Sequence, residues 1–188
     1  MFCANCLKVT KEKEPLKNGR CIICGWCIGD KYHFFYGGYL SQWSDCSFTI
    51  GDIKFTSAEQ YMMYTKAVMF EDYSIMEQIL ETTDPSEQKR LGKLVHNFSQ
   101  YVWDREKYNI ICTGNLAKFT QDLEHKEFLL NTGNKIIVEA SEDDTVYGIG
   151  LGIDDSRIWE PKQWKGTNLL GKCLVHVREL IKKYYKEN

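Results

Sequence analysis

The stretch of sequence that decides the fold covers residues 57–67 and reads SAEQYMMYTKA. Ser57, with Gln60 three residues later, forms the capping-box pattern that marks the start of a helix. The residues that follow are good helix formers, so a helix is predicted over residues 57–70. Glu59 would lie in its first turn, where unpaired amides and the helix dipole favour a carboxylate anion.

Lys66 follows Glu59 at a distance of two helical turns, on the same face. A carboxylate and an amine that share a face are suited to act as an acid/base and a nucleophile. A capping glutamate and a solvated or ion-paired lysine would give the same pattern, because first-turn glutamates are common. These residues alone leave both interpretations open.

The segments around this helix predict strands as well. Residues 48–50 and 53–55 flank a Gly51-Asp52 turn, which is typical of a hairpin. Two more strands are expected in the second half of the chain, at residues 135–140 and 146–151.

Further helices are indicated by capping and breaking residues. Asp84-Pro85 with Glu87 indicates a helix start, and Gly133 indicates a helix end. The expected helices cover residues 71–81, a segment after Pro85, and residues 103–120, 122–131 and 168–185. The last helix would place one apolar face toward the core, formed by Leu170, Leu174, Val177, Ile181 and Tyr184. The fold class is therefore α+β and mostly helical, with a small β-sheet.

The composition of the 188 residues indicates the class of protein. An apolar content of 43%, a charged content of 27% and a net charge of −2 are typical of a soluble chain with one ordinary domain and a small accessory module. Neither a run of about 20 apolar residues nor a secretory signal is present, so we expect a cytoplasmic protein without a membrane span. The small net charge leaves only local basic segments to attract nucleic acid.

Four cysteines near the start of the chain have the spacing of a zinc site. Cys3-x2-Cys6 is followed, after fourteen residues, by Cys21-x2-Cys24, and each pair directs two thiolates at one point. Residues 1–30 are therefore predicted to form a zinc ribbon with a structural Zn²⁺, ahead of a catalytic domain at residues 31–188. Cys27 is an alternative ligand to Cys24. Unliganded buried thiols are the other interpretation, but this spacing seldom arises without a metal.

Two further segments have features of a binding site. Trp103 can stack on a flat base, although large aromatic residues more often belong to the core. The acidic turn at residues 141–144 precedes Tyr147-Gly148-Ile149-Gly150, where glycines let a ligand approach the backbone. These glycines match neither a phosphate loop nor a dinucleotide fingerprint.

Several short motifs occur in one order along the chain. They are FYGGYLSQW at residues 35–43, FTI at 48–50, AEQYMM at 58–63, KRLG at 89–92, AKF at 117–119, LLNTG at 129–133, VEAS at 138–141, GIGL at 148–151 and NLLG at 168–171. Each is short, but the ordered set is specific, and over about residues 34–180 it resembles the NADAR domain, also called YbiA-like. The resemblance does not extend to residues 1–30.

The resemblance implies an enzyme that cleaves the N-glycosidic bond between a ribose derivative and a base. By position, Glu59 matches the catalytic glutamate, Lys66 the lysine on the same helix, Trp103 the tryptophan near the base, and Asp144 the acidic residue before the Gly-x-Gly strand. The implied substrate contacts are Tyr36, Gly37, Ser41, Gln42, Trp43, Lys118, Tyr147, Gly148 and Asn168. This chain departs from the family at two of them, since Gln42 replaces the usual asparagine and Tyr147 replaces a frequent tryptophan.

The family's branches differ in substrate. One removes ADP-ribose from guanine bases of nucleic acid, which reverses DNA ADP-ribosylation, and another acts on ribosylaminopyrimidine phosphates of the riboflavin pathway. We expect the first activity, because basic residues beside the zinc ribbon can guide a nucleic-acid strand, namely Lys8, Lys11, Lys13, Lys17 and Arg20. Glu12 and Glu14 interleave with them, so a solvated face is an equal interpretation.

Two other functions stay open on the sequence. One is hydrolysis of a small ribosylated base in metabolite repair, and the other is a binding module for ADP-ribose or NAD without turnover. The complete catalytic set argues against a module that only binds. A monomer is expected.

Overall fold

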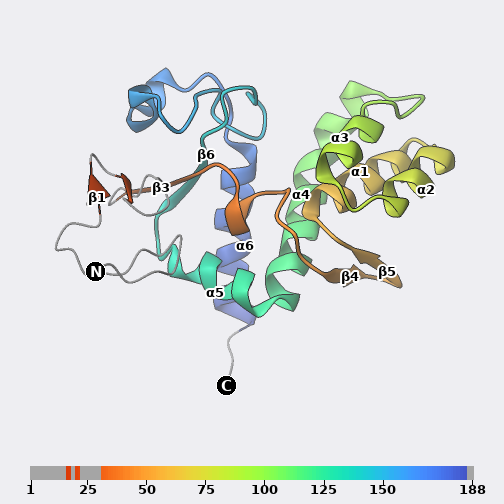
Figure 1. Cartoon of the computed structure of the whole chain (residues 1–188), viewed down its shortest axis with the longest axis horizontal. Coiled ribbons are helices and arrows are strands. Elements are labelled where there is room, and N and C mark those ends of the chain that lie inside the picture. The colour runs from red at the N-terminus through yellow and green to blue at the C-terminus, as the bar shows by residue number, and fades with distance from the viewer. Residues whose placement is uncertain (1–15, 18–19, 22–30, 186–188) are drawn as a thin grey trace. The chain divides into compact units, whose positions relative to one another are not determined.

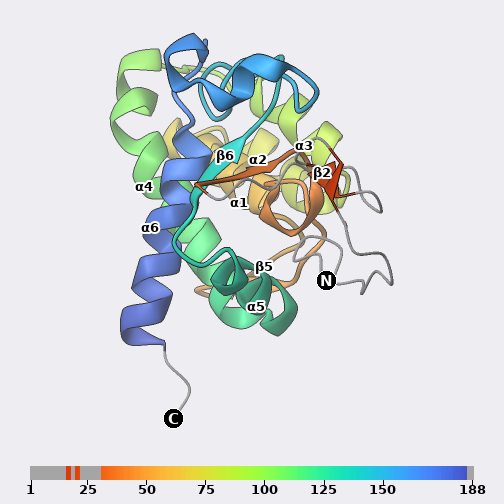
Figure 2. The same ribbon diagram turned by 90° about the vertical axis from the view of Figure 1, so that its left-hand side faces the viewer.

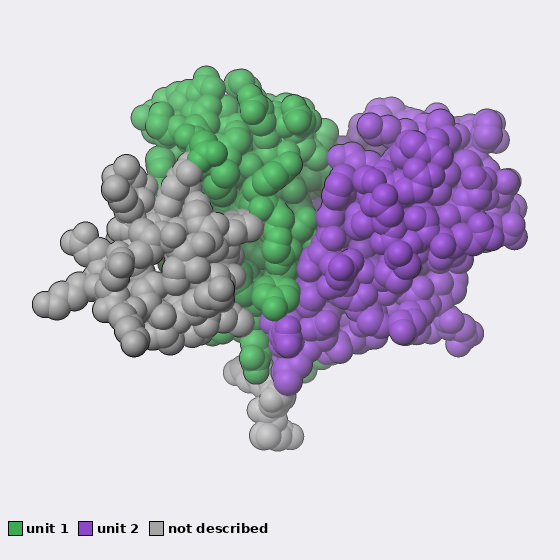
Figure 3. All heavy atoms as spheres, viewed as in Figure 1, with its two compact units in different colours: residues 1–41, 127–186, 188 green, residues 42–126, 187 purple. Residues whose placement is uncertain are grey.

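The computed structural model describes residues 16–17, 20–21 and 31–185 (Figure 1). Within these residues the chain divides into two compact units (Figure 3). Unit 1 comprises the residues up to Ser41 and those from Glu127 onward, and unit 2 comprises Gln42–Lys126. In the described part of the chain, no helix combines the length and the apolarity needed to cross a bilayer.

Unit 2 is a helical bundle with one hairpin. Its helices are α1 (Ala58–Met69), α2 (Tyr73–Glu81), α3 (Pro85–Gly92) and α4 (Gln100–Gln121), and its strands are β4 (Phe48–Ile50) and β5 (Ile53–Phe55). Helix α1 contacts α2, α3 and α4, and Figure 1 shows these helices side by side. The strands pair in the antiparallel sense, with Ile50 opposite Ile53 and Gly51 at a φ of 59°, so the predicted hairpin is confirmed.

Only one of the two hydrogen bonds of the predicted capping box is present at the start of α1. The Ser57 hydroxyl accepts a hydrogen bond from the Gln60 N–H at 2.9 Å. The Gln60 side chain does not complete the predicted box, because its oxygen accepts from the Thr56 N–H at 2.8 Å and its amide donates to the carbonyls of Ile79 and Thr82. Gln60 therefore links the helix start to the end of α2 and the residue that follows it.

The start of α3 departs from its prediction in the same way. Asp84 caps the helix by accepting from the Ser86 N–H at 2.9 Å. Glu87 does not reach back to complete a box, because both of its carboxylate oxygens accept from the Arg90 guanidinium at 2.7 Å.

Two glycines let the neighbouring helices approach α1. A Cβ on Gly92 would lie 2.0 Å from the sulfur of Met63, and a Cβ on Gly114 would lie 2.4 Å from Cδ1 of Tyr61. Close contact therefore fixes α1 against α3 and α4.

Unit 1 is built around a pair of parallel strands. Strand β3 (Tyr32–Phe35) pairs with β6 (Ile136–Glu139), with Phe34 opposite Val138. Helix α6 (Leu169–Tyr184) contacts β6, and Figure 2 shows the two elements side by side. The unit also contains the 3-10 turns η1 (Gly38–Leu40), η2 (Ser156–Trp159) and η3 (Pro161–Gln163), and helix α5 (Leu123–Asn131) ends in it. Its core joins the two strands to the loop after β6, through residues that include Phe34, Val138, Ile149 and Ile158.

The strand predicted at residues 146–151 is wrong. The carboxylate of Asp144 accepts from the N–H groups of Val146 at 2.9 Å, Tyr147 at 2.7 Å and Gly148 at 3.3 Å, which curls the backbone into a turn. Gly150 then adopts a φ of 66°, a left-handed conformation that a strand does not use. Ile149 and Leu151 of this segment are buried in a loop.

The predicted apolar face of the last helix is confirmed except at its end. Leu170, Leu174, Val177 and Ile181 are buried, whereas Tyr184 is 64% exposed.

The described residues contain a short antiparallel hairpin from the predicted zinc module, β1 (Leu16–Lys17) with β2 (Arg20–Cys21). Cys3, Cys6 and Cys24 lie outside the described residues. The zinc site therefore stays a prediction.

Candidate active site

Glu59 is a buried carboxylate at the start of α1. It lies in the first helical turn and is only 3% exposed. Its N–H donates to the carbonyl of Gln42 at 3.0 Å, which holds the preceding loop against the helix. The partial positive charge of the helix start favours an anion at this position.

Lys66 lies two turns further along α1 and is half-buried. Its ammonium donates to the carbonyl of Gly92 at 2.6 Å. Burial lowers the pKa of Lys66 below its ordinary value, and the charge of Glu59 opposes that shift in part. The two predicted groups are thus close enough to interact electrostatically.

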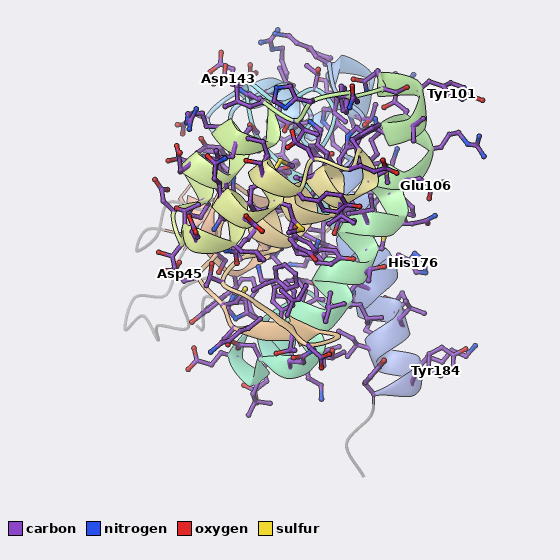
Figure 4. All side chains as sticks on the ribbon, turned by 90° about the vertical axis from the view of Figure 1, so that its right-hand side faces the viewer. Asp45, Tyr101, Glu106, Asp143, His176 and Tyr184 are labelled. Atoms are coloured by element: carbon purple, nitrogen blue, oxygen red, sulfur yellow. The ribbon has the colours of Figure 1, made fainter. Side chains whose placement is uncertain are left out.

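Two aromatic rings face this ammonium. The nitrogen lies 4.1 Å from the ring centre of Phe98 and 5.7 Å from that of Trp103. Trp103 is 6% exposed and belongs to the first turn of α4, where its neighbour Tyr101 is 71% exposed and points outward (Figure 4). Trp103 therefore borders the amine as an inner residue of unit 2.

The remaining predicted contacts in unit 2 differ in their surroundings. Gln42 is buried, and Asn115 donates to its side-chain oxygen at 2.8 Å. Trp43 is 44% exposed, and the Lys89 ammonium lies 5.7 Å from its ring. Lys118 is fully buried, and desolvation lowers its pKa to about 8.

The predicted contacts before Gln42 belong to unit 1 and lie around the η1 turn. Tyr36 is 63% exposed, and Gly37 adopts a φ of 86° that favours glycine. Ser41 closes the turn, since its N–H donates to the carbonyl of Gly38 at 3.0 Å.

The other predicted residues of unit 1 have well-defined roles within that unit. Asp144 organises the turn described above, and Tyr147 is half-buried within it. Gly148 is buried, and a Cβ there would lie 2.9 Å from the carbonyl oxygen of Asp144. The side chain of Asn168 accepts from the Glu139 N–H at 3.0 Å and donates to the carbonyl of Ile137 at 2.9 Å, which joins the start of α6 to β6.

Three features of the site in unit 2 had no sequence signal. They are the ring of Phe98 and the carbonyl of Gly92, which both contact Lys66, and Asn115, which donates a hydrogen bond to the Gln42 side chain. Gly92 is the last residue of α3, Phe98 lies between α3 and α4, and Asn115 lies within α4. The motif KRLG includes Gly92, but its carbonyl carries no residue-specific pattern.

Together these residues give unit 2 the parts needed for acid/base or nucleophilic chemistry. A buried carboxylate stabilises developing positive charge, because a low-dielectric setting strengthens its field. An amine with a lowered pKa has a larger neutral fraction, which is the nucleophilic form.

Comparison with known proteins matches this chain to one family. Residues 34–182 match the model of the NADAR domain. N-glycosidase R617 of Acanthamoeba polyphaga mimivirus is 40% identical over 163 residues, which cover 80% of this chain and 96% of that protein. Riboflavin biosynthesis protein VVA0006 of Vibrio vulnificus is 25% identical over 151 residues, which cover 80% of this chain and 37% of that protein.

The fold has a solved counterpart. The NMR structure of the Escherichia coli protein YbiA superposes with a TM-score of 0.68 at 23% identity, covering 92% of this chain and 98% of the other. The matched family model spans most of the chain, and the mimivirus relative aligns over nearly its whole length. The chain belongs to the NADAR family.

Proposed function

We propose that this chain is an N-glycoside hydrolase that removes ADP-ribose from guanine bases of nucleic acid. The general reaction is supported by the mimivirus relative, which is named an N-glycosidase and is 40% identical to this chain. The observation in this structure that supports it most is the buried Glu59 carboxylate, which interacts with the Lys66 amine from the same face of α1.

Glu59 acts on the sugar. Cleavage of an N-glycosidic bond places positive charge on the anomeric carbon and the ring oxygen in the transition state. The carboxylate stabilises that charge and takes a proton from water or from a ribose hydroxyl. The partial positive charge at the start of α1 favours the anionic form of Glu59, which suits a stabilising group or a base better than a standing acid.

Lys66 acts on the opened sugar. Its neutral amine adds to C1 of the ring-opened ribose while the base is still attached. The C1–N bond to the base then breaks, the base leaves with a proton from the attacking amine, and water hydrolyses the resulting imine to the free sugar and the amine. The lowered pKa of Lys66 favours this role, because more of the amine is neutral than in an exposed lysine. Trp103 borders the amine and provides a flat apolar surface beside it.

A structural zinc ion in residues 1–30 is part of the proposal. The four thiols are the donor set that Zn²⁺ prefers, and strand β2 of the hairpin β1–β2 contains Cys21, the first cysteine of the second pair. The ion would be held by Cys3, Cys6, Cys21 and Cys24 and would stabilise the fold of this module without taking part in the reaction.

The second candidate substrate is a ribosylaminopyrimidine phosphate of the riboflavin pathway. The similarity to the Vibrio vulnificus riboflavin biosynthesis protein favours it, although this chain spans only about a third of that protein. Both substrates need the same bond cleavage, so the catalytic residues do not discriminate between them.

One experiment separates these candidates. The purified protein is incubated with ADP-ribosylated guanine in single-stranded DNA and, separately, with the ribosylaminopyrimidine phosphate, and the released base and sugar are followed by chromatography. The proposal predicts release from the DNA substrate at a higher kcat/KM. Faster turnover of the pyrimidine substrate would transfer the function to metabolite repair, and no release from either would reject N-glycoside hydrolysis of both.

A further inference from the structure

Beside Glu59, unit 2 contains a pair of buried side-chain amides, Gln42 and Asn115. They are 7% and 0% exposed. The Asn115 nitrogen donates both to the Gln42 side-chain oxygen and to the carbonyl of Ile111, each at 2.8 Å. These two contacts fix the orientation of both amides, because exchanging oxygen and nitrogen in either one would bring like groups together.

In this orientation, one hydrogen-bond donor and one acceptor of the amide pair remain unused. The Gln42 side-chain nitrogen and the Asn115 side-chain oxygen are buried and have no hydrogen-bond partner among the described residues. Buried polar groups without partners lower stability, so natural proteins retain few of them, often at functional sites.

The position of this pair connects it to the proposed catalytic group. The backbone carbonyl of Gln42 accepts the N–H of Glu59 at 3.0 Å, so one peptide hydrogen bond joins the amide pair to the start of α1. The loop that follows Gln42 has a second backbone hydrogen bond to this region, because the N–H of Cys46 donates to the carbonyl of Thr56 at 3.1 Å. The loop is thus held against the residues that precede and begin α1.

We propose that Gln42 and Asn115 form a subsite for a neutral group of the substrate that accepts one hydrogen bond and donates one. The Gln42 side-chain nitrogen donates to this group and the Asn115 side-chain oxygen accepts from it, and the hydrogen bond between the two amides holds both in this orientation. A ribose hydroxyl and the amide edge of a base both have this chemistry, whereas an ionised phosphate oxygen has no proton to donate. This inference rests on the proposed function and specifies which part of an N-glycoside the site reads.

A double variant tests the subsite. Gln42→Met with Asn115→Leu removes every hydrogen-bonding atom of the pair at similar volume. Replacing both partners by apolar groups is close to neutral for stability, and here it also removes two unpartnered atoms. We expect a melting temperature equal to or above that of the wild type, with kcat/KM lower by about 10- to 100-fold and KM raised.

A second buried glutamine provides the matched control for stability. Gln60 uses both its oxygen and its nitrogen in hydrogen bonds within the protein, so Gln60→Met should lower the melting temperature. A melting temperature that falls in Gln60→Met but not in the double variant would show that Gln60 stabilises the fold, whereas Gln42 and Asn115 do not.

Substrate analogues identify the group that binds. If a 2′-deoxy or 3′-deoxy ribose lowers kcat/KM in the wild type but not in the double variant, the subsite holds that hydroxyl; if neither does, it holds the base edge. An active wild type whose double variant keeps its kcat/KM, or loses it only in step with melting temperature, overturns this inference alone. A wild type that cleaves no N-glycoside overturns the proposed function and this subsite with it.

Discussion

At the scale of single residues, Lys66 is subject to opposing effects. Burial favours its neutral form, whereas the Glu59 charge, the Gly92 carbonyl and the faces of Phe98 and Trp103 favour the ammonium. The pKa of Lys66 is lowered overall, so desolvation is the larger effect. The surroundings of Lys66 therefore position its ammonium group, and its lowered pKa makes loss of the proton easier than in an exposed lysine.

This balance gives a prediction about covalent trapping. If Lys66 forms an imine with the sugar, borohydride should reduce it to a stable adduct whose mass identifies the released sugar. Adduct formation should rise with pH, with a midpoint below the ordinary lysine value of about 10.4, because only the neutral amine adds to the sugar. Phe98→Leu should move the midpoint lower, since it removes the ring face that stabilises the ammonium at similar apolar volume.

Two lysine variants control this experiment. Lys66→Met should abolish the adduct, whereas Lys54→Met, at an exposed lysine of β5, should leave it unchanged. An adduct that persists in Lys66→Met, or no adduct in the active wild type, would remove Lys66 from the proposed mechanism.

The sequence predicted the residues of the site that share one helix better than those joined by tertiary contact. Glu59 and Lys66 follow from helical spacing, and the structure places both on α1, where the Glu59 charge raises the pKa of Lys66. Phe98 and Asn115 had no signal, because their roles depend on where α4 and the loop before it pack against α1. Asp144 was predicted as catalytic, and that role stays a prediction; its observed contacts organise a turn.

At the scale of elements, α1 carries the proposed chemistry and is fixed by close helix contacts. Gly114 gives α4 its approach to the ring of Tyr61, at a distance that no side chain would allow. This close packing holds in place the helix that carries Glu59 and Lys66.

Gly114→Ala should therefore destabilise the protein. The added methyl would overlap Cδ1 of Tyr61, and overpacking costs about 1–3 kcal/mol, which exceeds the gain of up to about 1 kcal/mol in helix propensity. Urea unfolding should show a lower midpoint. Asn109→Ala, at an exposed position of the same helix, should be neutral or slightly stabilising. If Gly114→Ala were as stable as this control, the close packing of α1 and α4 would be disproved.

Element prediction succeeded where the signal was local. The hairpin at Gly51 and the helices followed from turn and capping residues, although both capping boxes proved incomplete because Gln60 and Glu87 found other partners. The strand expected at residues 146–151 is absent because the Asp144 carboxylate accepts hydrogen bonds from three successive N–H groups and imposes a turn. Strand β3 was not assigned, since its partner β6 lies about a hundred residues away in sequence.

At the scale of the whole molecule, the described chain forms two units. Unit 1 is assembled from two separate stretches of sequence, and the stretch that separates them along the chain forms unit 2. Local patterns cannot predict such an arrangement, because it depends on which distant segments pair. The sequence did predict the α+β class and a mostly helical content.

The zinc module is a prediction at this scale, and metal analysis tests it. The purified full chain should contain about one zinc ion per molecule, bound by four thiolates. Cobalt substitution should then give the intense thiolate charge-transfer bands of a tetrahedral sulfur site. Cys6→Ser should lose the metal, whereas Cys173→Ser, at a buried cysteine of α6, should retain it. Protein without zinc after purification in its presence would contradict the ribbon.

The most direct test of the catalytic assignment is the turnover of Glu59→Gln. This substitution keeps the size of the side chain and removes its negative charge. Release of free base from an N-glycoside that the wild type cleaves should fall by about 10²- to 10⁴-fold. Glu124→Gln, at an exposed first-turn glutamate of α5, should keep wild-type turnover. Near-normal turnover of Glu59→Gln would contradict the assignment of Glu59 as the catalytic carboxylate.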